Sequence, residues 1–234
     1  MNYSNKDLYL KKQFNVYPPF DGTKGEKMKL FIVFEGGEGS GKTIQSHMLA
    51  DHLKEKGAGV FLTKEPGGDT SVCQSIRGIL LNADYKISPK TELLLFAADR
   101  AQHVDNVIIP ELKRGNIVIC DRFDAATYAY QVCARKVPYK NFKNLNDFAK
   151  GKLSPDLIFW FDLDPAIGLK RNVDAGKKDR FELEDIAFHK KVRAGYEKYF
   201  SKLPKEKYAK IDASKSIEEI HREILQILEN KFRV

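Results

Sequence analysis

The eight residues Gly36-Gly37-Glu38-Gly39-Ser40-Gly41-Lys42-Thr43 place four glycines, a lysine and a hydroxyl side chain in one short loop. The glycines permit a backbone turn in which successive N–H groups face inward. These N–H groups, with the positive end of a following helix dipole, form a cradle for a phosphate chain. In such a loop the lysine reaches the β and γ phosphates and the hydroxyl group binds Mg²⁺. The segment therefore predicts a P-loop that binds ATP.

The residues on either side of the loop provide the structural context that this motif requires. Leu30–Phe34 is an unbroken apolar run, which is typical of a strand buried on both faces of a parallel sheet. A helix is expected from about Gly41 to Lys56, where Gly57 ends it. The apolar face predicted for this helix consists of Ile44, Met48, Leu49 and Leu53.

The rest of the chain continues this alternation of strands and helices. Further strands are expected at 60–63, 117–120, 157–161 and 208–211. Helices are expected at 71–81 and 89–104, and another begins at about 125. One more follows Pro165, and after a polar segment a further helix runs to about 200. The final helix carries a stripe of apolar residues from 217 to 228. The order predicts an α/β fold, a P-loop NTPase three-layer sandwich with a parallel five-stranded sheet covered by helices on both faces.

Length and composition fit one globular domain more readily than two small ones. The 234 residues are 42% hydrophobic and 31% charged. Cys73, Cys120 and Cys133 lie far apart with no CxxC pair, which indicates free thiols in a reducing compartment and hence the cytoplasm. No apolar run reaches the roughly 18 to 20 residues that span a bilayer, and the N-terminus lacks the features of a secretory signal. No membrane association is therefore expected.

The formal net charge of +8 points to anionic partners. Nucleotide phosphates and nucleic acid both satisfy this charge. Most of the basic residues are scattered, as on a solvated surface. A nucleic-acid-binding ATPase would show salt-sensitive DNA binding, but we expect no nucleic-acid partner.

Asp121 follows the apolar strand 117–120 directly, as a Walker-B acid does. At the carboxyl edge of a parallel sheet it would bind Mg²⁺ together with Thr43. The alternative is that Asp121 caps the next helix, and the two roles are compatible.

A basic polar segment lies between two late helices. Its cationic residues are Lys170, Arg171, Lys177, Lys178 and Arg180. Arginines that close over a transferring phosphoryl group stabilise its charge and exclude water. This composition predicts a lid at about 171–181, although a solvated loop would have a similar sequence.

Several motifs, in the same order along the chain, resemble those of thymidylate kinases. They are Phe34–Thr43, Glu65–Gly68, Glu92–Arg100, Asp121–Phe123, Ala129–Gln131, Pro155–Leu157, Asp162–Pro165 and Asp179–Glu182. The resemblance covers residues 29–234 and implies a thymidylate kinase-like domain, with residues 1–28 as a flexible extension that has no counterpart. It implies transfer of the γ-phosphoryl group of ATP to dTMP with Mg²⁺, and a homodimer.

The resemblance also assigns residues to the acceptor site. Phe96 would stack on the thymine ring and Arg100 would hydrogen-bond its edge, since an aromatic face and a rigid guanidinium fork suit a base. Phe96 as ordinary core is the alternative. Tyr130 would lie against the sugar 2′ position, or else be a buried helix aromatic. The remaining acceptor residues would be Glu38 at the 3′-hydroxyl, Arg122 and Arg77 at the phosphate, and Thr127 and Gln131 along the same pocket.

For catalysis and for the donor, the resemblance implies a bacterial arrangement with basic residues in the lid. Lys42 and Arg122 would stabilise the transferring group, and Arg180, then Arg171, would be the catalytic lid arginine. Asp212 and Ala213 would flank the adenine. The sequence departs from the family pattern where Asp69 is inserted before Thr70, and where Phe123 replaces a tyrosine.

Two other functions compete with this one. A kinase of another deoxynucleotide, or one of relaxed base choice, would share the P-loop but not the set of Phe96, Arg100 and Tyr130. A GTPase switch needs an Asn-Lys-x-Asp guanine motif after the P-loop, and none is present. The only Asn-Lys-Asp, at residues 5–7, lies upstream and is one residue short.

Overall fold

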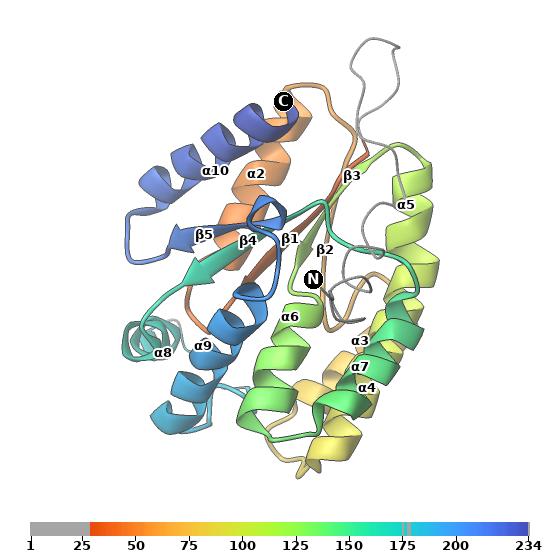
Figure 1. Cartoon of the computed structure of the whole chain (residues 1–234), viewed down its shortest axis with the longest axis vertical. Helices are drawn as coiled ribbons and strands as arrows, with labels where there is room; N and C mark the ends of the chain where they lie inside the picture. Colours follow the sequence, from red (N-terminus) through yellow and green to blue (C-terminus); the bar gives the residue numbers. More distant parts are fainter. Residues whose placement is uncertain (1–28, 175, 177–178, 234) are drawn as a thin grey trace, which may run out of the picture.

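The computed structural model describes residues 29–174, 176 and 179–233 (Figure 1). The predicted N-terminal extension, residues 1–28, lies outside the described residues, as do Lys177 and Lys178 of the predicted lid.

Five parallel strands form the central sheet, in the order β2-β3-β1-β4-β5. They are β1 (Phe31–Gly36), β2 (Val60–Lys64), β3 (Ile117–Asp121), β4 (Leu157–Asp162) and β5 (Tyr208–Asp212). β1 is buried along its whole length and pairs with β3 and β4, with Phe34 opposite Asp121 and Phe159. This parallel five-stranded sheet confirms the predicted fold class. The apolar runs form its strands because helices cover both faces and bury their side chains.

Helices connect the strands and cover the sheet. They are α2 (Lys42–Glu55), α3 (Ser71–Leu81), α4 (Pro89–His103), η1 (Val104–Ile108), α5 (Ile109–Lys113), α6 (Asp124–Thr127), η2 (Tyr128–Ala134), α7 (Tyr139–Lys150), α8 (Pro165–Asp174), α9 (Ile186–Phe200), η3 (Lys205–Lys207) and α10 (Ile217–Phe232). In Figure 1, α2 and α10 lie on one side of the sheet and α4 to α7 and α9 lie on the other.

Each face of the sheet has its own apolar core. Alternate residues of β1 divide between the two: Ile32 packs with Leu49 of α2 and Ile224 of α10, whereas Val33 packs on the face that α9 covers. This division follows from the two-residue side-chain period of a strand. Because all five strands are parallel, their carboxyl ends lie at the same edge of the sheet.

Two local predictions differ from the structure. Ile44, expected in the apolar face of the first helix, is 49% exposed and lines the mouth of the cavity described below. The first turn of α2 faces the P-loop and not the core, so Lys42, Gln45 and Ser46 are buried there instead. The helix predicted to end at 104 continues to Lys113 through the π-helical turn η1. That wider turn accommodates Pro110, whose ring does not fit regular α spacing.

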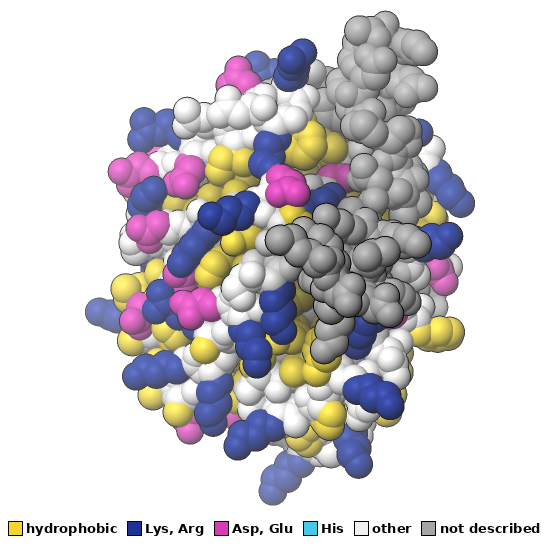
Figure 2. Space-filling model, viewed as in Figure 1, with side chains coloured by type: hydrophobic (Ala, Val, Ile, Leu, Met, Phe, Trp, Pro, Cys, Tyr) yellow, Lys and Arg dark blue, Asp and Glu magenta, His cyan; other side chains and the backbone are white. Residues whose placement is uncertain are grey.

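Within the described residues, no helix is long and apolar enough to cross a membrane. Lys and Arg side chains are spread over the visible face of the molecule, between apolar and uncharged ones (Figure 2). This distribution agrees with the interpretation of most basic residues as solvated surface.

Candidate active site

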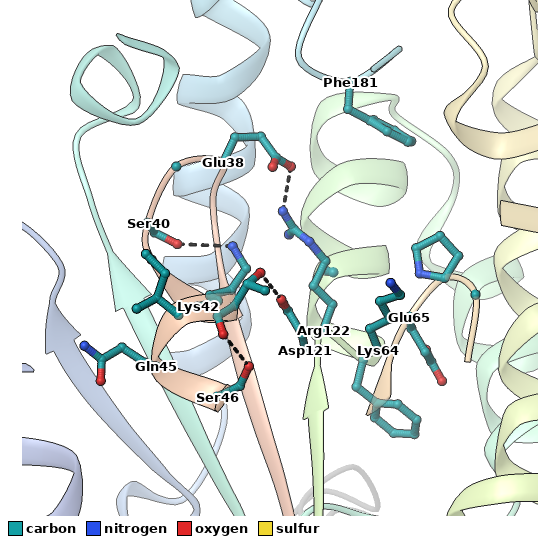
Figure 3. Close-up of a pocket in the computed structure, with 18 of the residues that line it drawn as sticks. Glu38, Ser40, Lys42, Gln45, Ser46, Lys64, Glu65, Asp121, Arg122 and Phe181 are labelled. Atoms are coloured by element: carbon teal, nitrogen blue, oxygen red, sulfur yellow. Dashed lines mark hydrogen bonds and ion pairs between the residues drawn. The ribbon is translucent and has the colours of Figure 1, made fainter. Parts of the chain in front are cut away.

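One cavity of about 1240 Å³ opens at the carboxyl edge of the sheet. Its walls come from the P-loop, the ends of β2 and β3, helices α4 and η2, the segment after α8, and the start of α10. Figure 3 shows Lys42, Asp121 and Arg122 converging on this space, with Phe181 on its far side. A parallel α/β sheet is expected to bind ligands at this edge.

The P-loop closes around the amine of Lys42. Its Nζ donates to the carbonyl of Gly37 at 2.7 Å and to Ser40 Oγ at 3.1 Å. Gly39 has φ +65°, and a Cβ there would lie 2.1 Å from the carbonyl oxygen of Gly168 in α8, so only glycine fits. Burial and the nearby charge of Arg122 lower the pKa of Lys42 to about 8, although acidic neighbours oppose this. A bound phosphate would raise this pKa again, because it favours the charged amine.

Thr43 and Asp121 meet as predicted for a magnesium site. Thr43 Oγ1 donates to Asp121 Oδ2 at 2.5 Å, and Asp121 Oδ1 is buried without a hydrogen-bond partner. A hydroxyl and a carboxylate oxygen are the hard ligands that Mg²⁺ prefers, and the unpartnered oxygen is free to bind it. The described residues contain no group of three or more His, Cys, Asp or Glu that could hold a metal, so the remaining ligands would be phosphates and water. Asp121 does not cap α6, whose N-cap is Phe123.

Glu38, Arg122 and Tyr130 form a connected unit beside the P-loop. Arg122 donates to Glu38 Oε1 at 2.6 Å and to the carbonyl of Gly36 at 2.8 Å, and the hydroxyl of Tyr130 donates to the same Glu38 oxygen at 2.7 Å. Burial by itself would raise the pKa of Glu38. The charges of Arg122 and Lys42 and the Tyr130 hydrogen bond outweigh it and lower the pKa to about 2. Glu38 is therefore an anion that ties the phosphate loop to the second half of the cavity.

Glu35 lies beneath this unit and carries a perturbed carboxyl. Its Oε1 accepts from the N–H of Phe123 at 2.8 Å, and its Oε2 accepts from the hydroxyl of Tyr196 at 3.1 Å. Complete burial raises its pKa to about 7, against the opposing charge of Arg122. The group therefore titrates near neutral pH in the folded protein.

We expect the stability of this protein to fall between pH 5 and 7 because of Glu35. Its pKa is about 7 when folded and 4.5 ordinarily, so the folded state holds more protons in this window and loses stability as pH rises. Over the whole window the free energy of unfolding should fall by about 3 kcal/mol. Glu35→Gln should reduce this slope in melting temperatures measured from pH 5 to 8; the part that remains includes Asp99, whose pKa burial raises to about 6. Parallel pH profiles for the variant and the parent protein would contradict the assignment.

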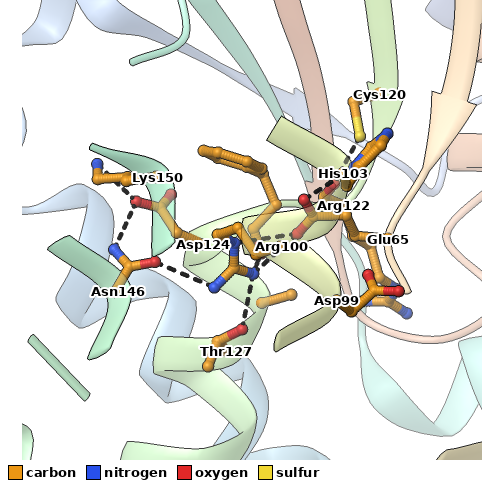
Figure 4. Close-up of polar contacts among 12 residues, drawn as sticks. Glu65, Asp99, Arg100, His103, Cys120, Arg122, Asp124, Thr127, Asn146 and Lys150 are labelled. Atoms are coloured by element: carbon orange, nitrogen blue, oxygen red, sulfur yellow. Dashed lines mark hydrogen bonds and ion pairs between the residues drawn. The ribbon is translucent and has the colours of Figure 1, made fainter. Parts of the chain in front are cut away.

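Arg100 is buried in a polar network rather than free at the cavity surface (Figure 4). It donates through Nε to Glu65 and through its terminal nitrogens to Asn146, the carbonyl of Phe123 and Thr127 Oγ1, each at 3.0 Å. Four of its five N–H groups are thereby used, and one is left for a ligand. Because Thr127 Oγ1 accepts from Arg100, the hydroxyl proton of Thr127 remains available to donate.

Phe96, Arg77 and Gln131 also line the cavity. Phe96 is half-buried, and its ring centroid lies 6.0 Å from that of Phe181. The ring centroid of Phe181 lies 5.6 Å from that of Tyr130, and these two rings meet edge-on. Arg77 donates to the carbonyl of Pro66 at 2.7 Å. The structure thus brings together all the predicted acceptor residues, and it adds Phe181 as an aromatic wall.

The two predicted lid arginines are placed differently. Arg171 lines the cavity and donates to the carbonyl oxygens of Ala213 at 3.1 Å and of Gly39 at 3.4 Å. Arg180 does not line it. Its guanidinium donates to Glu92 at 2.5 Å and to the carbonyl of Leu80 at 3.0 Å. The role of Arg180 as the catalytic lid arginine stays a prediction, and in this structure the buried carboxylate of Glu92 binds it outside the cavity.

The predicted adenine loop is only partly at the cavity. Asp212 and Ala213 do not line it, whereas the following Lys215, Ser216 and Ile217 do. The Asp212 carboxylate instead accepts from the backbone N–H and hydroxyl of Ser214. This local turn is common for aspartate and could have been read from the sequence.

Sequence reasoning also assigned no role to several residues at or behind the cavity. They are Glu35, Glu65, Asp69, Glu92, Phe181 and Tyr196. Asp69, inserted relative to the family pattern, lines the cavity and accepts from the hydroxyl of Thr63 at 2.8 Å. Glu35, Glu65, Glu92 and Phe181 lie within the motifs quoted above, but their partners are distant in sequence, so the motifs did not predict what they contact.

The P-loop, with the Thr43 hydroxyl and the Asp121 carboxylate beside it, shares one cavity with an aromatic-lined wall formed by Phe96, Tyr130 and Phe181. This combination defines a P-loop kinase that phosphorylates a small ring-containing substrate. Comparison with known proteins identifies the family within this class. Residues 34–224 match the family model described as thymidylate kinase.

The chain is 45% identical over 212 residues to the thymidylate kinase of Pelobacter propionicus, covering 87% of this chain and 96% of that one. It is 44% identical over 197 residues to the thymidylate kinase of Exiguobacterium sp., covering 84% and 92%. The crystal structure of thymidylate kinase from Ehrlichia chaffeensis superposes with a TM-score of 0.70 at 33% identity, covering 86% and 99%. The chain belongs to the thymidylate kinase family. It is a kinase that phosphorylates dTMP to dTDP.

Proposed function

We propose that the cavity holds ATP in the P-loop and dTMP in the aromatic-lined pocket, with Glu38, Arg122 and Tyr130 joining the two. The observation that carries this proposal is the single carboxylate oxygen of Glu38, which receives hydrogen bonds from both Arg122 and Tyr130. A group that belongs to the P-loop thereby positions two side chains of the acceptor pocket. The donor and acceptor phosphates would then meet beside Arg122.

The donor end follows from the P-loop geometry. Lys42 would leave its carbonyl partner and contact the β and γ phosphates, and Arg171 would approach them from α8. Thr43 and Asp121 would hold Mg²⁺, which when bound neutralises charge on the phosphate oxygens. Lys215, Ser216 and Ile217 line the cavity near Ala213 and would contact the adenosine.

The acceptor end uses the second pocket. Phe96 would stack on thymine, with Arg100, Thr127 and Gln131 along its edge. The carboxylate of Glu38 would accept a hydrogen bond from the 3′-hydroxyl. Arg122 and Arg77 would bind the phosphate, whose oxygen attacks the γ-phosphorus directly. No nucleophilic side chain is needed, and catalysis rests on positioning and charge stabilisation.

Among the lid arginines, Arg171 is our candidate for contact with the transferring group. Its exposed guanidinium already borders the P-loop, whereas Arg180 is held by Glu92. Arg180 would reach the phosphates only after that ion pair breaks. The lid at 171–181, the homodimer and the cytoplasmic location remain predictions.

A coupled assay of ADP release across nucleoside monophosphates tests the acceptor assignment. With dTMP, dUMP, UMP, dCMP and dGMP at equal concentrations, dTMP should give the highest kcat/KM. Comparable rates with dGMP would contradict the pocket proposed here, because a purine would not fit the arrangement of Phe96, Arg100 and Tyr130.

We expect Tyr130→Ala to increase the use of a ribonucleotide relative to dTMP by about tenfold. The buried ring of Tyr130, fixed by its bond to Glu38, would occupy the space that a 2′-hydroxyl needs. The measurement is the ratio of kcat/KM for ribothymidine monophosphate to that for dTMP. Tyr128→Ala is the matched control, because Tyr128 is equally buried but packs against Phe142, outside the cavity. A ratio that changes equally in both variants would return Tyr130 to a packing role.

A further inference from the structure

Glu92 is a buried carboxylate of α4 that stands directly behind the cavity wall. Its relative exposure is 0%. Oε1 accepts from Gln131 Nε2 at 2.8 Å and from Arg135 Nε at 3.3 Å, and Oε2 accepts from Arg180 at 2.5 Å. The two guanidinium groups balance its charge. Of its three partners, only Gln131 lines the cavity.

The amide of Gln131 has a donor end and an acceptor end, and Glu92 determines which end is offered to a ligand. The donor end is used by Glu92, while the amide oxygen of Gln131 is buried and has no hydrogen-bond partner. If the amide turned over, its oxygen would face a carboxylate oxygen with no proton between them. Charge repulsion therefore excludes the turned orientation.

An unpartnered buried oxygen is unfavourable unless a ligand donates to it. On its pairing edge, thymine carries a ring N–H flanked by carbonyl oxygens, whereas the same ring nitrogen of cytosine carries no hydrogen and accepts. Gln131 thus offers an acceptor to the thymine N–H. The hydroxyl proton of Thr127, left free by the bond from Arg100, suits a neighbouring carbonyl.

We propose that Glu92 is a positioning residue for base selection. By holding the Gln131 amide with its oxygen toward the cavity, it favours pyrimidines with a ring N–H over cytosine. This inference rests on the proposed placement of the base beside Gln131. Glu92 contacts no substrate and acts only through Gln131.

The test is the ratio of kcat/KM for dTMP to that for dCMP in Glu92→Gln. The introduced amide has one acceptor oxygen for three donors, and the charged arginines compete for it most strongly. Its NH₂ group would then face Gln131 and turn that amide over, so that a donor is offered to the base. We expect the ratio to fall about tenfold, the equivalent of one hydrogen bond.

Glu111→Gln is the matched control. Glu111 is also a buried, arginine-paired glutamate, with Arg114 and Asn116 as partners, and neither it nor these two partners line the cavity. Its variant should keep the parent ratio. Melting temperatures of both variants report folding separately from selectivity.

The double variant Glu92→Gln with Gln131→Glu should recover the preference for dTMP, because a carboxylate presents an acceptor whichever way it turns. An unchanged ratio in Glu92→Gln, with a ratio lost in Gln131→Leu, would overturn the role of Glu92 while keeping Gln131 as a base contact. An unchanged ratio in both would overturn the inference through its premise, the placement of the base beside Gln131. Equal losses with both substrates would reduce Glu92 to a stabilising residue.

Discussion

Arg122→Ala should lower kcat/KM for dTMP by about a thousandfold. Its guanidinium joins the carbonyl of Gly36 to the carboxylate of Glu38, at the place where donor and acceptor phosphates are proposed to meet. Its removal takes away the charge that draws them together. It also removes the ion-pair partner of Glu38. The negative charge of Glu38 would then repel the acceptor phosphate more strongly. Steady-state kinetics with saturating ATP and varied dTMP measure the loss.

Arg122→Lys separates charge from geometry. Lysine keeps the positive charge but lacks the planar fork that reaches two partners at once, so an intermediate loss of about a hundredfold is expected. Arg122 has φ 73°, and both substitutions keep a Cβ at this left-handed position, so the backbone cost is common to them. Arg193→Ala is the control, since Arg193 forms a similar ion pair with Asp162 but does not line the main cavity. Near-normal turnover in Arg122→Ala would refute its role.

Lys42→Ala should lower kcat by about a thousandfold. Lys42 is buried within the P-loop, and its amine binds Gly37 and Ser40 where β and γ phosphates would compete for it. The other two cations at this loop contact it elsewhere, because Arg122 binds Gly36 and Glu38 and Arg171 binds the carbonyl of Gly39. Lys54→Ala, on the exposed side of the same helix, should leave turnover unchanged. A loss common to both variants would indicate damage to the helix instead.

The pKa of about 8 for Lys42 gives this prediction a pH dependence. Phosphate binding raises the pKa, so ATP binding at pH 8 should take up about half a proton per site, and KM for ATP should rise as the pH increases past 8. Calorimetric titrations of ATP in two buffers with different ionisation enthalpies measure this uptake. Lys42→Ala should abolish it. Proton uptake that persists in the variant would assign it to another group.

The fold and the position of the P-loop could be predicted because they depend largely on local sequence. The apolar run Leu30–Phe34 and the glycines of the P-loop specify a strand, a turn and a helix within about 25 residues. Thr43 and Asp121 meet because β1 and β3 are neighbours, and the carboxyl ends of parallel strands share one edge. A P-loop after one buried strand and an aspartate after another, in this order along the chain, were enough to predict that Thr43 and Asp121 meet.

The surroundings of the polar side chains could not be predicted in the same way. Arg180 has the lid sequence expected of a catalytic arginine, yet it pairs with Glu92, 88 positions earlier. Arg100 was expected to read a base, and most of its donors are used by Glu65, Asn146 and Thr127. A guanidinium binds whichever carboxylate or carbonyl the fold brings near, and this choice leaves no periodic trace in the sequence.

The eight residues from Gly36 to Thr43 thus determined, by themselves, a phosphate-binding loop between a buried strand and a helix. They did so because glycine conformations, strand burial and helix polarity are properties of short segments. Only the tertiary structure decided that Glu38 of this loop binds Arg122 and Tyr130, and that Glu92 orients Gln131 from behind the cavity. These contacts join residues 39 to 92 positions apart, and their energies depend on burial and charge, which exist only once the chain has folded.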